Sequence, residues 1–402
     1  MNNKSVAIFL ATTLISGICL AQTNQTAVVE DFKTTATTQQ GKQFPQVNSE
    51  HRVRVSIAAP KALKVQLDIS AVKYDLTKDT EGVWTGESAP QDEGFHYYQL
   101  TIDGASVPDP GSLYFYGASR WGSGIEVPAR DQDFYALKNV PHGQLRESQY
   151  FSKTTNSVRR VYIYTPPEYD KANSNRYPVL YLQHGMGENE TGWGNQGHAN
   201  LIMDNLIAEG KTTPFIIVME NSSVNLGPRG ARPAGIPGQA APQQGAPVSN
   251  GPRTVGGGPM GGVNFAAQFQ KILFEDLIPY IESNYRVIAD QSHRAMAGLS
   301  MGGMQTHTIV VAAPDKFSYV GMFSSGTFSP TEITDMDSFK KKIKVVFMSF
   351  GGREGGSTRI QAAAEEWNKA GIKGVSYVSP ETAHEWQSWR RSLYEFAPLL
   401  FK

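Results

Sequence analysis

The sequence predicts an α/β fold with a mostly parallel sheet and helices on both faces, preceded by a small all-β domain. Two observations support this prediction. Residues 47–127 contain short segments in which apolar and polar residues alternate, and they show no helical period. From residue 159 on, short apolar runs alternate with stretches whose apolar residues recur every three or four positions, as in parallel strands joined by helices. We therefore place the all-β domain at residues 47–135 and the α/β domain at residues 136–402.

The N-terminal residues 1–21 have the pattern of a secretory signal peptide. Lys4 precedes an apolar run over residues 6–20, and Ala21 offers a small residue for cleavage. A lipoprotein signal ending at Cys19 is the alternative, but the residues before that cysteine match it poorly. The expected location is therefore secreted or periplasmic. Residues 22–46, rich in Thr, Gln and Ala, are expected to form a flexible leader.

Composition excludes several classes of function. Lys plus Arg and Asp plus Glu both number 37, so the formal net charge is zero, which argues against nucleic acid or an anionic membrane as a partner. The apolar run near the N-terminus is too short to span a bilayer, so no membrane anchor is expected. Cys19 is the single cysteine, and the mature chain would hold no disulfide, thiol nucleophile or thiolate metal site. We expect neither a metal nor a cofactor, and the oligomeric state stays open.

In the all-β domain, residues 52–57, 63–69 and 95–102 are the clearest strands, separated by Gly, Pro and Asp turns. About 90 residues of this kind suggest a β-sandwich. Three aromatic residues are candidates for a flat platform on which a sugar could stack, although a place in the core or between domains is the more common role of such residues. They are Trp84, Tyr97 and Trp121.

The α/β domain offers seven strand candidates, at residues 159–164, 179–183, 215–219, 293–297, 319–323, 344–350 and 375–378. A helix that begins at Phe265 and a last helix that contains Trp386 and Trp389 both carry an apolar stripe that should pack on the sheet. Residues 222–263 are dense in Gly and Pro, and we expect a mobile loop there. A lid over the site and a tolerated insertion are both open readings of that loop.

The segment Gly298-Leu-Ser300-Met-Gly302 has the Gly-x-Ser-x-Gly pattern of a nucleophile elbow. It lies between a buried strand candidate at residues 293–297 and a helical pattern at residues 301–313. In this setting the serine occupies a tight strand-to-helix turn, and the glycines leave room where a Cβ would clash. The sequence therefore predicts Ser300 as a nucleophile.

A serine nucleophile needs a base, and in this chain order the base follows it. His307 and His384 are the two histidines after Ser300. His307 lies two turns along the predicted helix and cannot fold back. His384 follows the last strand candidate, so we predict it as the base.

The acid that orients the histidine should follow the strand after the elbow. Glu354 comes directly after residues 344–350 and is the best placed carboxylate. Four other carboxylates lie nearby in sequence and are expected on the solvated surface, namely Asp335, Asp337, Glu365 and Glu366.

An oxyanion hole needs two backbone N–H groups. Met301, directly after the serine, provides one. The other should come from the loop after residues 179–183, which begins His184-Gly185-Met186, and we choose Met186. His184 is expected to shape that turn.

Residues 161–402 resemble the catalytic domain of carbohydrate esterase family 1, the feruloyl and acetylxylan esterases of the α/β-hydrolase superfamily. The resemblance rests on the His184-Gly185 loop with Trp193 after it, on the segment at residues 294–303, and on the tail that begins His384-Glu-Trp386. It implies an esterase without a cofactor and makes Trp193 a candidate for substrate binding. Trp386, next to the predicted base, could face either the core or the substrate and is a second candidate. The family commonly has Asp where this chain has Glu354.

The all-β domain resembles the immunoglobulin-like family 48 carbohydrate-binding module, through Gly82-Val-Trp84 and the segment at residues 94–100. Together the two resemblances imply an exported serine esterase of plant cell-wall polysaccharide, most simply a feruloyl esterase on feruloylated xylan. Acetylxylan esterase, siderophore esterase and a non-catalytic carbohydrate-binding protein are the alternatives.

Overall fold

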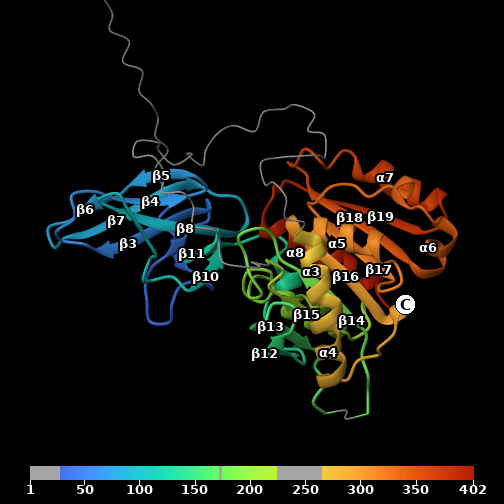
Figure 1. The fold of residues 1–402 in the computed structure, drawn as a ribbon. Helices are drawn as coiled ribbons and strands as arrows, with labels where there is room; N and C mark the ends of the chain where they lie inside the picture. Colours follow the sequence, from blue (N-terminus) through green and yellow to red (C-terminus); the bar gives the residue numbers. More distant parts are fainter. Residues whose placement is uncertain (1–27, 172–173, 224–264) are drawn as a thin grey trace, which may run out of the picture.

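The computed structural model describes residues 28–171, 174–223 and 265–402. The predicted signal peptide and nearly all of the Gly- and Pro-rich segment 222–263 lie outside these ranges. Within them the chain forms an N-terminal β-sandwich and a larger α/β domain, which lie side by side (Figure 1).

Two antiparallel sheets form the sandwich. The first has the strand order β1-β2-β3-β7-β6 and the second the order β10-β11-β8-β4-β5, with β9 paired to β8. Their bounds are β1 Lys33–Thr34, β2 Gln46–Val47, β3 Arg52–Ala58, β4 Val65–Ile69, β5 Val72–Asp75, β6 Thr77–Lys78, β7 Val83–Pro90, β8 Gly94–Ile102, β9 Ala105–Val107, β10 Tyr114–Gly117 and β11 Arg120–Val127. Inward-facing residues of both sheets, such as Val55, Leu67 and Leu100, are fully buried between them.

The leader predicted at residues 22–46 is ordered where the structure describes it, so this prediction is wrong for residues 28–46. Strand β1 pairs with β2. Thr37 is buried, its carbonyl accepts the N–H of Leu113 at 2.8 Å, and its hydroxyl accepts the N–H of Glu126 at 3.2 Å. The segment is poor in apolar residues, but polar pairing with the sandwich fixes it.

One mixed sheet runs through the α/β domain, in the order β12-β13-β15-β14-β16-β17-β18-β19. Strand β13 is antiparallel to both of its neighbours, β12 and β15. The other six strands, β15, β14, β16, β17, β18 and β19, are parallel to one another. The bounds are β12 Gln144–Ser152, β13 Ser157–Thr165, β14 Val179–Gln183, β15 Ile216–Glu220, β16 Arg294–Leu299, β17 Tyr319–Phe323, β18 Val345–Gly351 and β19 Lys373–Ser379. The parallel part matches the prediction, and the antiparallel edge departs from it.

Helices cover both faces of this sheet, because alternate residues of the buried strands point to opposite sides. In β14, Val179 and Tyr181 pack into one core and Leu180 and Leu182 into the other. Helices α3 to α7 border the first core, and α2 and α8 border the second. Their bounds are α1 Gly192–Asn195, α2 Ala199–Ala208, α3 Phe265–Ile272, α4 Ile278–Asn284, α5 Met301–Ala312, α6 Met336–Lys342, α7 Ile360–Lys369 and α8 Trp386–Phe396, with a π-helical turn, Leu273–Leu277, between α3 and α4.

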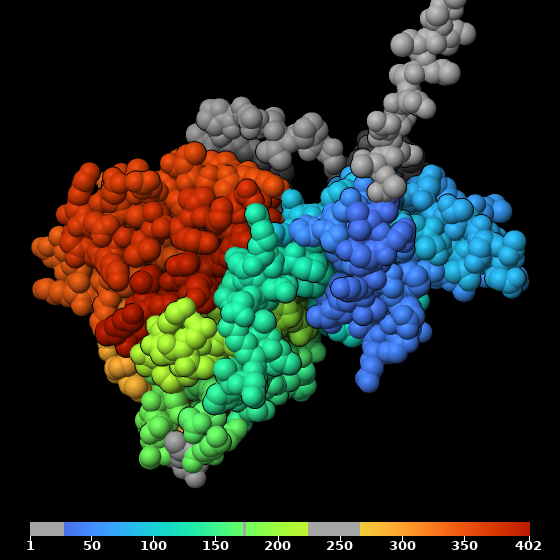
Figure 2. All heavy atoms as spheres, turned by 180° about the vertical axis from the view of Figure 1, so that it is seen from behind, coloured from blue at the N-terminus to red at the C-terminus, as the bar shows by residue number. Residues whose placement is uncertain are grey.

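The two domains share an apolar interface. Phe95 and Phe115 of the sandwich pack into the second core of the α/β domain, together with Tyr135 from the connecting segment. In the space-filling view the blue sandwich lies directly against the teal and green parts of the larger domain (Figure 2).

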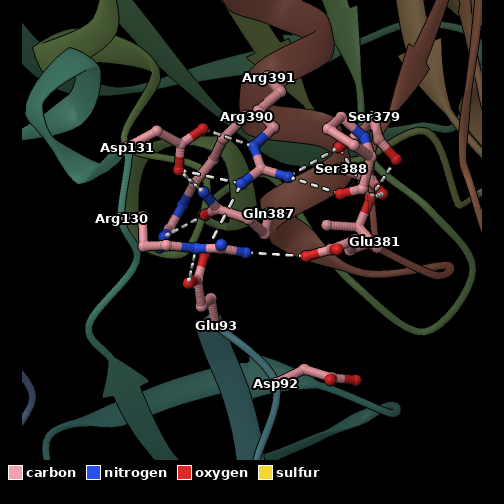
Figure 3. A network of polar contacts seen from close by, with 12 residues as sticks. Asp92, Glu93, Arg130, Asp131, Ser379, Glu381, Gln387, Ser388, Arg390 and Arg391 are labelled. Carbon is pink, nitrogen blue, oxygen red and sulfur yellow. Dashed lines mark hydrogen bonds and ion pairs between the residues drawn. The ribbon is translucent and has the colours of Figure 1, made fainter. Parts of the chain in front are cut away.

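Charged residues add to this interface. Arg390 of α8 is fully buried and holds Glu126 of β11 through two contacts of 2.6 and 2.9 Å. Further out, Arg391 binds Asp131, and Arg130 binds both Glu93 of the sandwich and Glu381 (Figure 3). The helix that follows the predicted base is thus tied to the N-terminal domain.

Candidate active site

The carboxyl ends of four neighbouring parallel strands meet at one edge of the large sheet, where open α/β folds place their sites. Each of these strands leads into one polar residue at this edge. Ser300 follows β16, Ser324 follows β17, Glu354 lies just beyond β18, and His384 lies in the turn after β19.

Ser300 has the backbone geometry that a nucleophile elbow requires. Its φ is +51° and its ψ is −115°, a strained combination for a residue with a side chain. A Cβ on Gly298 would lie 2.4 Å from the backbone carbon of Gly302, and a Cβ on Gly302 would lie 2.6 Å from the carbonyl oxygen of His184. The two glycines are therefore needed to form the turn, and Ser300 is left partly exposed.

Glu354 and His384 are in direct contact. Glu354 Oε1 lies 2.6 Å from His384 Nδ1, and the histidine side chain is 48% exposed. The other carboxylate oxygen, Oε2, accepts hydrogen bonds from Ser324 Oγ at 2.7 Å and from the N–H of Gly351 at 2.6 Å. Burial alone would raise the pKa of Glu354, but the bonds from His384, Ser324 and Gly351 hold that pKa below its usual value.

Sequence reasoning missed Ser324, which takes part in this arrangement. Its hydroxyl donates to Glu354 and accepts the indole N–H of Trp389 at 3.0 Å. The indole of Trp389 also packs edge-on against the ring of His384. The signal was present, because Ser324 directly follows a predicted buried strand at the same edge of the sheet as Ser300.

Asp335, Glu366 and His307, which we did not expect in the site, make other contacts. Asp335 accepts the N–H of Ser338 and caps α6. His307 Nε2 lies 2.9 Å from Glu332 Oε2, and Ser329 Oγ donates to Glu366. Asp337 on α6 and Glu365 on α7 are both exposed, as expected.

The loop after β14 lies close to the serine, since a Cβ on Gly185 would be 3.6 Å from Ser300 Cβ. His184 is buried and fixes the start of this loop. Its Nε2 accepts the N–H of Ser222 at 3.1 Å and lies 3.3 Å from Asn221 Oδ1, and its Nδ1 lies 2.7 Å from the carbonyl oxygen of Gly185. Burial lowers the pKa of His184, which keeps the ring neutral.

The two residues expected to supply oxyanion donors flank this position from different elements. Met186 lies in the loop after β14, and its side chain is 59% exposed. Met301 is the first residue of α5, whose N-terminus points its free N–H groups and positive dipole end toward the turn.

Trp193 and Trp386, predicted as substrate-binding candidates, are 1% and 2% exposed. Their rings pack edge-on against each other, and the indole N–H of Trp193 donates to the carbonyl of Gln183 at 3.0 Å. An indole without exposed surface offers no face to a substrate. We therefore correct this expectation, because both residues pack in the core beneath the site.

The three aromatic residues of the sandwich differ from one another. Trp84 is buried and donates to the carbonyl of Ala59, so it belongs to the sandwich core. Tyr97 lies between the domains. Trp121 is 51% exposed and packs edge-on against Tyr116, and it is the most exposed of the three.

Among residues 28–171, 174–223 and 265–402, no cluster of three His, Cys, Asp or Glu side chains is arranged to hold a metal ion. Over the same ranges, none of the helices has the length and apolar character that crossing a bilayer requires.

A family model described as Putative esterase matches residues 152–236 and 259–399. The endo-1,4-beta-xylanase/feruloyl esterase of Xylanibacter ruminicola is 42% identical over 381 residues, which cover 93% of this chain and 48% of the relative. Endo-1,4-beta-xylanase Y of Acetivibrio thermocellus is 24% identical over 278 residues, which cover 61% of this chain and 22% of that relative. The chain thus spans about half, or less, of the length of these relatives.

Two solved structures share the fold. A ferulic acid esterase of Anaeromyces mucronatus has a TM-score of 0.50 at 21% identity and covers 68% of this chain and 96% of its own. The enterobactin esterase of Shigella flexneri has a TM-score of 0.57 at 14% identity and covers 86% of this chain and 92% of its own. The 86% of this chain that is covered by the enterobactin esterase is more than the α/β domain after Tyr135 contains. The similarity in fold therefore extends into the sandwich.

Proposed function

The chain is a carboxylic ester hydrolase that belongs to the putative esterase family, and from this premise we propose that it hydrolyses feruloyl esters of xylan through Ser300, His384 and Glu354. The contact between His384 Nδ1 and Glu354 Oε1 is the observation that carries the proposed mechanism. Nδ1–H donates to the carboxylate, so Nε2 is left without a proton and is free to act as a base.

In the proposed reaction, His384 Nε2 takes the proton of Ser300 Oγ as Oγ forms a bond to the ester carbonyl carbon. The carbonyl electron pair moves onto oxygen and gives a tetrahedral oxyanion. When this intermediate collapses, the bond to the sugar oxygen breaks, and that oxygen takes the proton from Nε2. Water then repeats the sequence on the acyl-enzyme, which releases the acid and frees Ser300.

The oxyanion is assigned to the backbone N–H groups of Met186 and Met301. The close approach of Gly185 to Ser300 and the place of Met301 at the start of α5 support this assignment. Glu354, ionised because its pKa is held low, stabilises the imidazolium that forms in each step.

The relative that is 42% identical is an endo-1,4-beta-xylanase/feruloyl esterase, which supports a feruloyl ester of xylan as the substrate. Export from the cell, predicted from residues 1–21, agrees with a polymeric substrate. An acetyl ester would use the same machinery with a smaller acyl pocket. The siderophore alternative has support from fold similarity alone.

Two variants test the mechanism. Ser300→Ala and His384→Ala should each lower kcat on methyl ferulate by about 10⁴-fold or more, and the double variant should lose no more than the single ones because the groups act as a unit. Circular dichroism should show a folded protein in each case. Near-normal turnover by folded Ser300→Ala would exclude the serine mechanism.

The acyl group is tested on the unmodified protein with three esters. For each ester, kcat/KM is divided by the rate constant of its uncatalysed hydrolysis. If the proposal holds, this ratio is larger for methyl ferulate and for a feruloylated xylo-oligosaccharide than for an aryl acetate. A preference for the acetyl ester would assign the chain to acetylxylan instead.

A further inference from the structure

The loop that carries Met186 is in contact with the sandwich. The N–H of Ser119, in the turn between β10 and β11, donates to the carbonyl of Gly187 at 2.7 Å. Gly187 has a φ of +80°, and a Cβ there would lie 3.3 Å from the nitrogen of Ser119. The two backbones therefore approach closely, one residue away from Met186.

Glu188 closes the same loop from its other end. Its N–H donates to the carbonyl of Gly185 at 3.3 Å, and its Oε2 accepts the N–H of Gly185 at 3.4 Å. Met186 thus lies inside a turn whose two ends are joined by Glu188. The remaining oxygen, Oε1, lies 3.3 Å from the hydroxyl of Tyr97, which belongs to β8 of the sandwich.

Tyr97 is itself held from several sides. Its hydroxyl accepts the side-chain amide of Gln196 at 2.7 Å and the indole N–H of Trp386 at 3.3 Å. Its ring lies on Gly117, where a Cβ would come within 2.2 Å of Tyr97 Cζ. A hydroxyl fixed in this way is a rigid partner for Glu188.

We propose that Tyr97 is a positioning residue: through Glu188 it holds the backbone N–H of Met186 where the oxyanion forms, so that the sandwich completes the active site. This inference rests on the proposed function above, and it deepens that function by giving the N-terminal domain a part in the chemical step.

The placement matters because an oxyanion donor must lie within about 2.7–3.1 Å of the developing charge. The Met186 side chain is largely exposed and makes little packing that could hold its own backbone. Rigidity must come from the neighbouring residues, which are His184, Glu188 and the sandwich. Burial raises the pKa of Glu188 to about 8.

The main test is Tyr97→Phe, which removes the hydroxyl and keeps the ring. We expect kcat on methyl ferulate to fall about 10-fold, a fraction of the loss known for deleting an oxyanion donor, while KM stays within about twofold. Affinity for an aryl boronic acid, whose tetrahedral adduct with Ser300 places an oxygen in the oxyanion hole, should fall by a similar factor. Tyr114→Phe, which removes an exposed hydroxyl from the same sheet, is the matched control and should change neither quantity.

Two variants of Glu188 separate positioning from simple loss of structure. Glu188→Gln keeps an acceptor for Gly185 and a polar group for Tyr97, and it should retain activity within about threefold. Glu188→Ala should lose at least as much kcat as Tyr97→Phe. Thermal unfolding of each variant shows that the protein is folded at the assay temperature.

Wild-type kcat in folded Tyr97→Phe would overturn the inference, and so would a lower kcat with unchanged boronate affinity, or a change confined to KM. In each of these cases the wild type still hydrolyses the ester, so the proposed function stands. If the wild type hydrolyses no ester, the proposed function itself fails.

Discussion

Glu354 uses both of its carboxylate oxygens, and this division of work explains how a glutamate serves where the resembling family commonly has an aspartate. Oε1 faces His384, while Oε2 is held by Ser324 and Gly351. The longer side chain reaches the histidine from the end of β18, and two donors fix the position of its head group. The geometry agrees with the role that we propose for it.

Replacing Glu354 by Gln should lower kcat on methyl ferulate by about a hundredfold or more. The amide cannot stabilise the imidazolium, and its NH₂ group can favour the wrong tautomer of His384. Asp337→Asn, at an exposed position on α6, is the control and should leave kcat unchanged. If Asp337→Asn were the damaging change and Glu354→Gln the mild one, the acid would have to be reassigned.

Single site residues could be predicted from the sequence where chain order and spacing leave few candidates. Ser300 and His384 follow from the elbow and from the histidines that remain after it, and the contact between Glu354 and His384 is as expected from their places after neighbouring strands. The exposure of Trp193 and Trp386 could not be read from the sequence. An aromatic residue beside a site faces either the core or the substrate, and contacts between elements far apart in the sequence, such as that of Trp193 with Trp386, decide which.

Among the elements, the strand-to-helix turn at Ser300 depends most strictly on particular residues. Gly298→Ala should lower kcat by at least about a hundredfold and also lower the melting temperature, because its Cβ would overlap the backbone of Gly302 and push the serine out of position. Gly355→Ala is the matched control, since a Cβ at Gly355 meets no atom within 4 Å among the described residues. Activity and calorimetry on both variants measure the difference, and equal values would contradict a strict requirement for glycine at residue 298.

Strands β14 and β17 have the bounds that their sequences predict, because both are buried on the two faces and read as continuous apolar runs. Strand β12 was not predicted. It lies at the edge of the sheet with mostly exposed or half-exposed residues, so its sequence QLRESQYFS lacks that signal. Its backbone hydrogen bonds with β13 hold this segment as a strand although its own sequence does not predict one.

At the scale of the whole molecule, the buried pair of Arg390 and Glu126 joins the two domains. Glu126→Gln should lower the free energy of unfolding by about 3 kcal/mol or more, because it leaves a buried guanidinium without its counter-charge. Asp92→Asn, which breaks the exposed pair with Arg353, should cost less than about 1 kcal/mol. Urea denaturation of both variants measures the two values.

The difference in free energy of unfolding between the wild type and Glu126→Gln should also depend on pH. Burial alone would raise its pKa, but Arg390 holds that pKa below the usual value of 4.5. The stabilisation is therefore present above pH 4.5 and is lost as the pH falls through the lowered pKa, where the wild type becomes as neutral as the Gln variant. A difference that grew in acid would contradict this assignment.

Phe95 and Phe115 lie in the core of the catalytic domain although they belong to the sandwich by sequence and topology. The boundary near residue 135 thus separates the two domains along the chain, but both domains contribute side chains to one hydrophobic core. Moving the sandwich onto another esterase, or replacing it by a different domain, would expose an apolar surface on the α/β domain and two aromatic rings on the sandwich. Such a chimera should fold well only if the residues that pack around Phe95 and Phe115 are transferred with them.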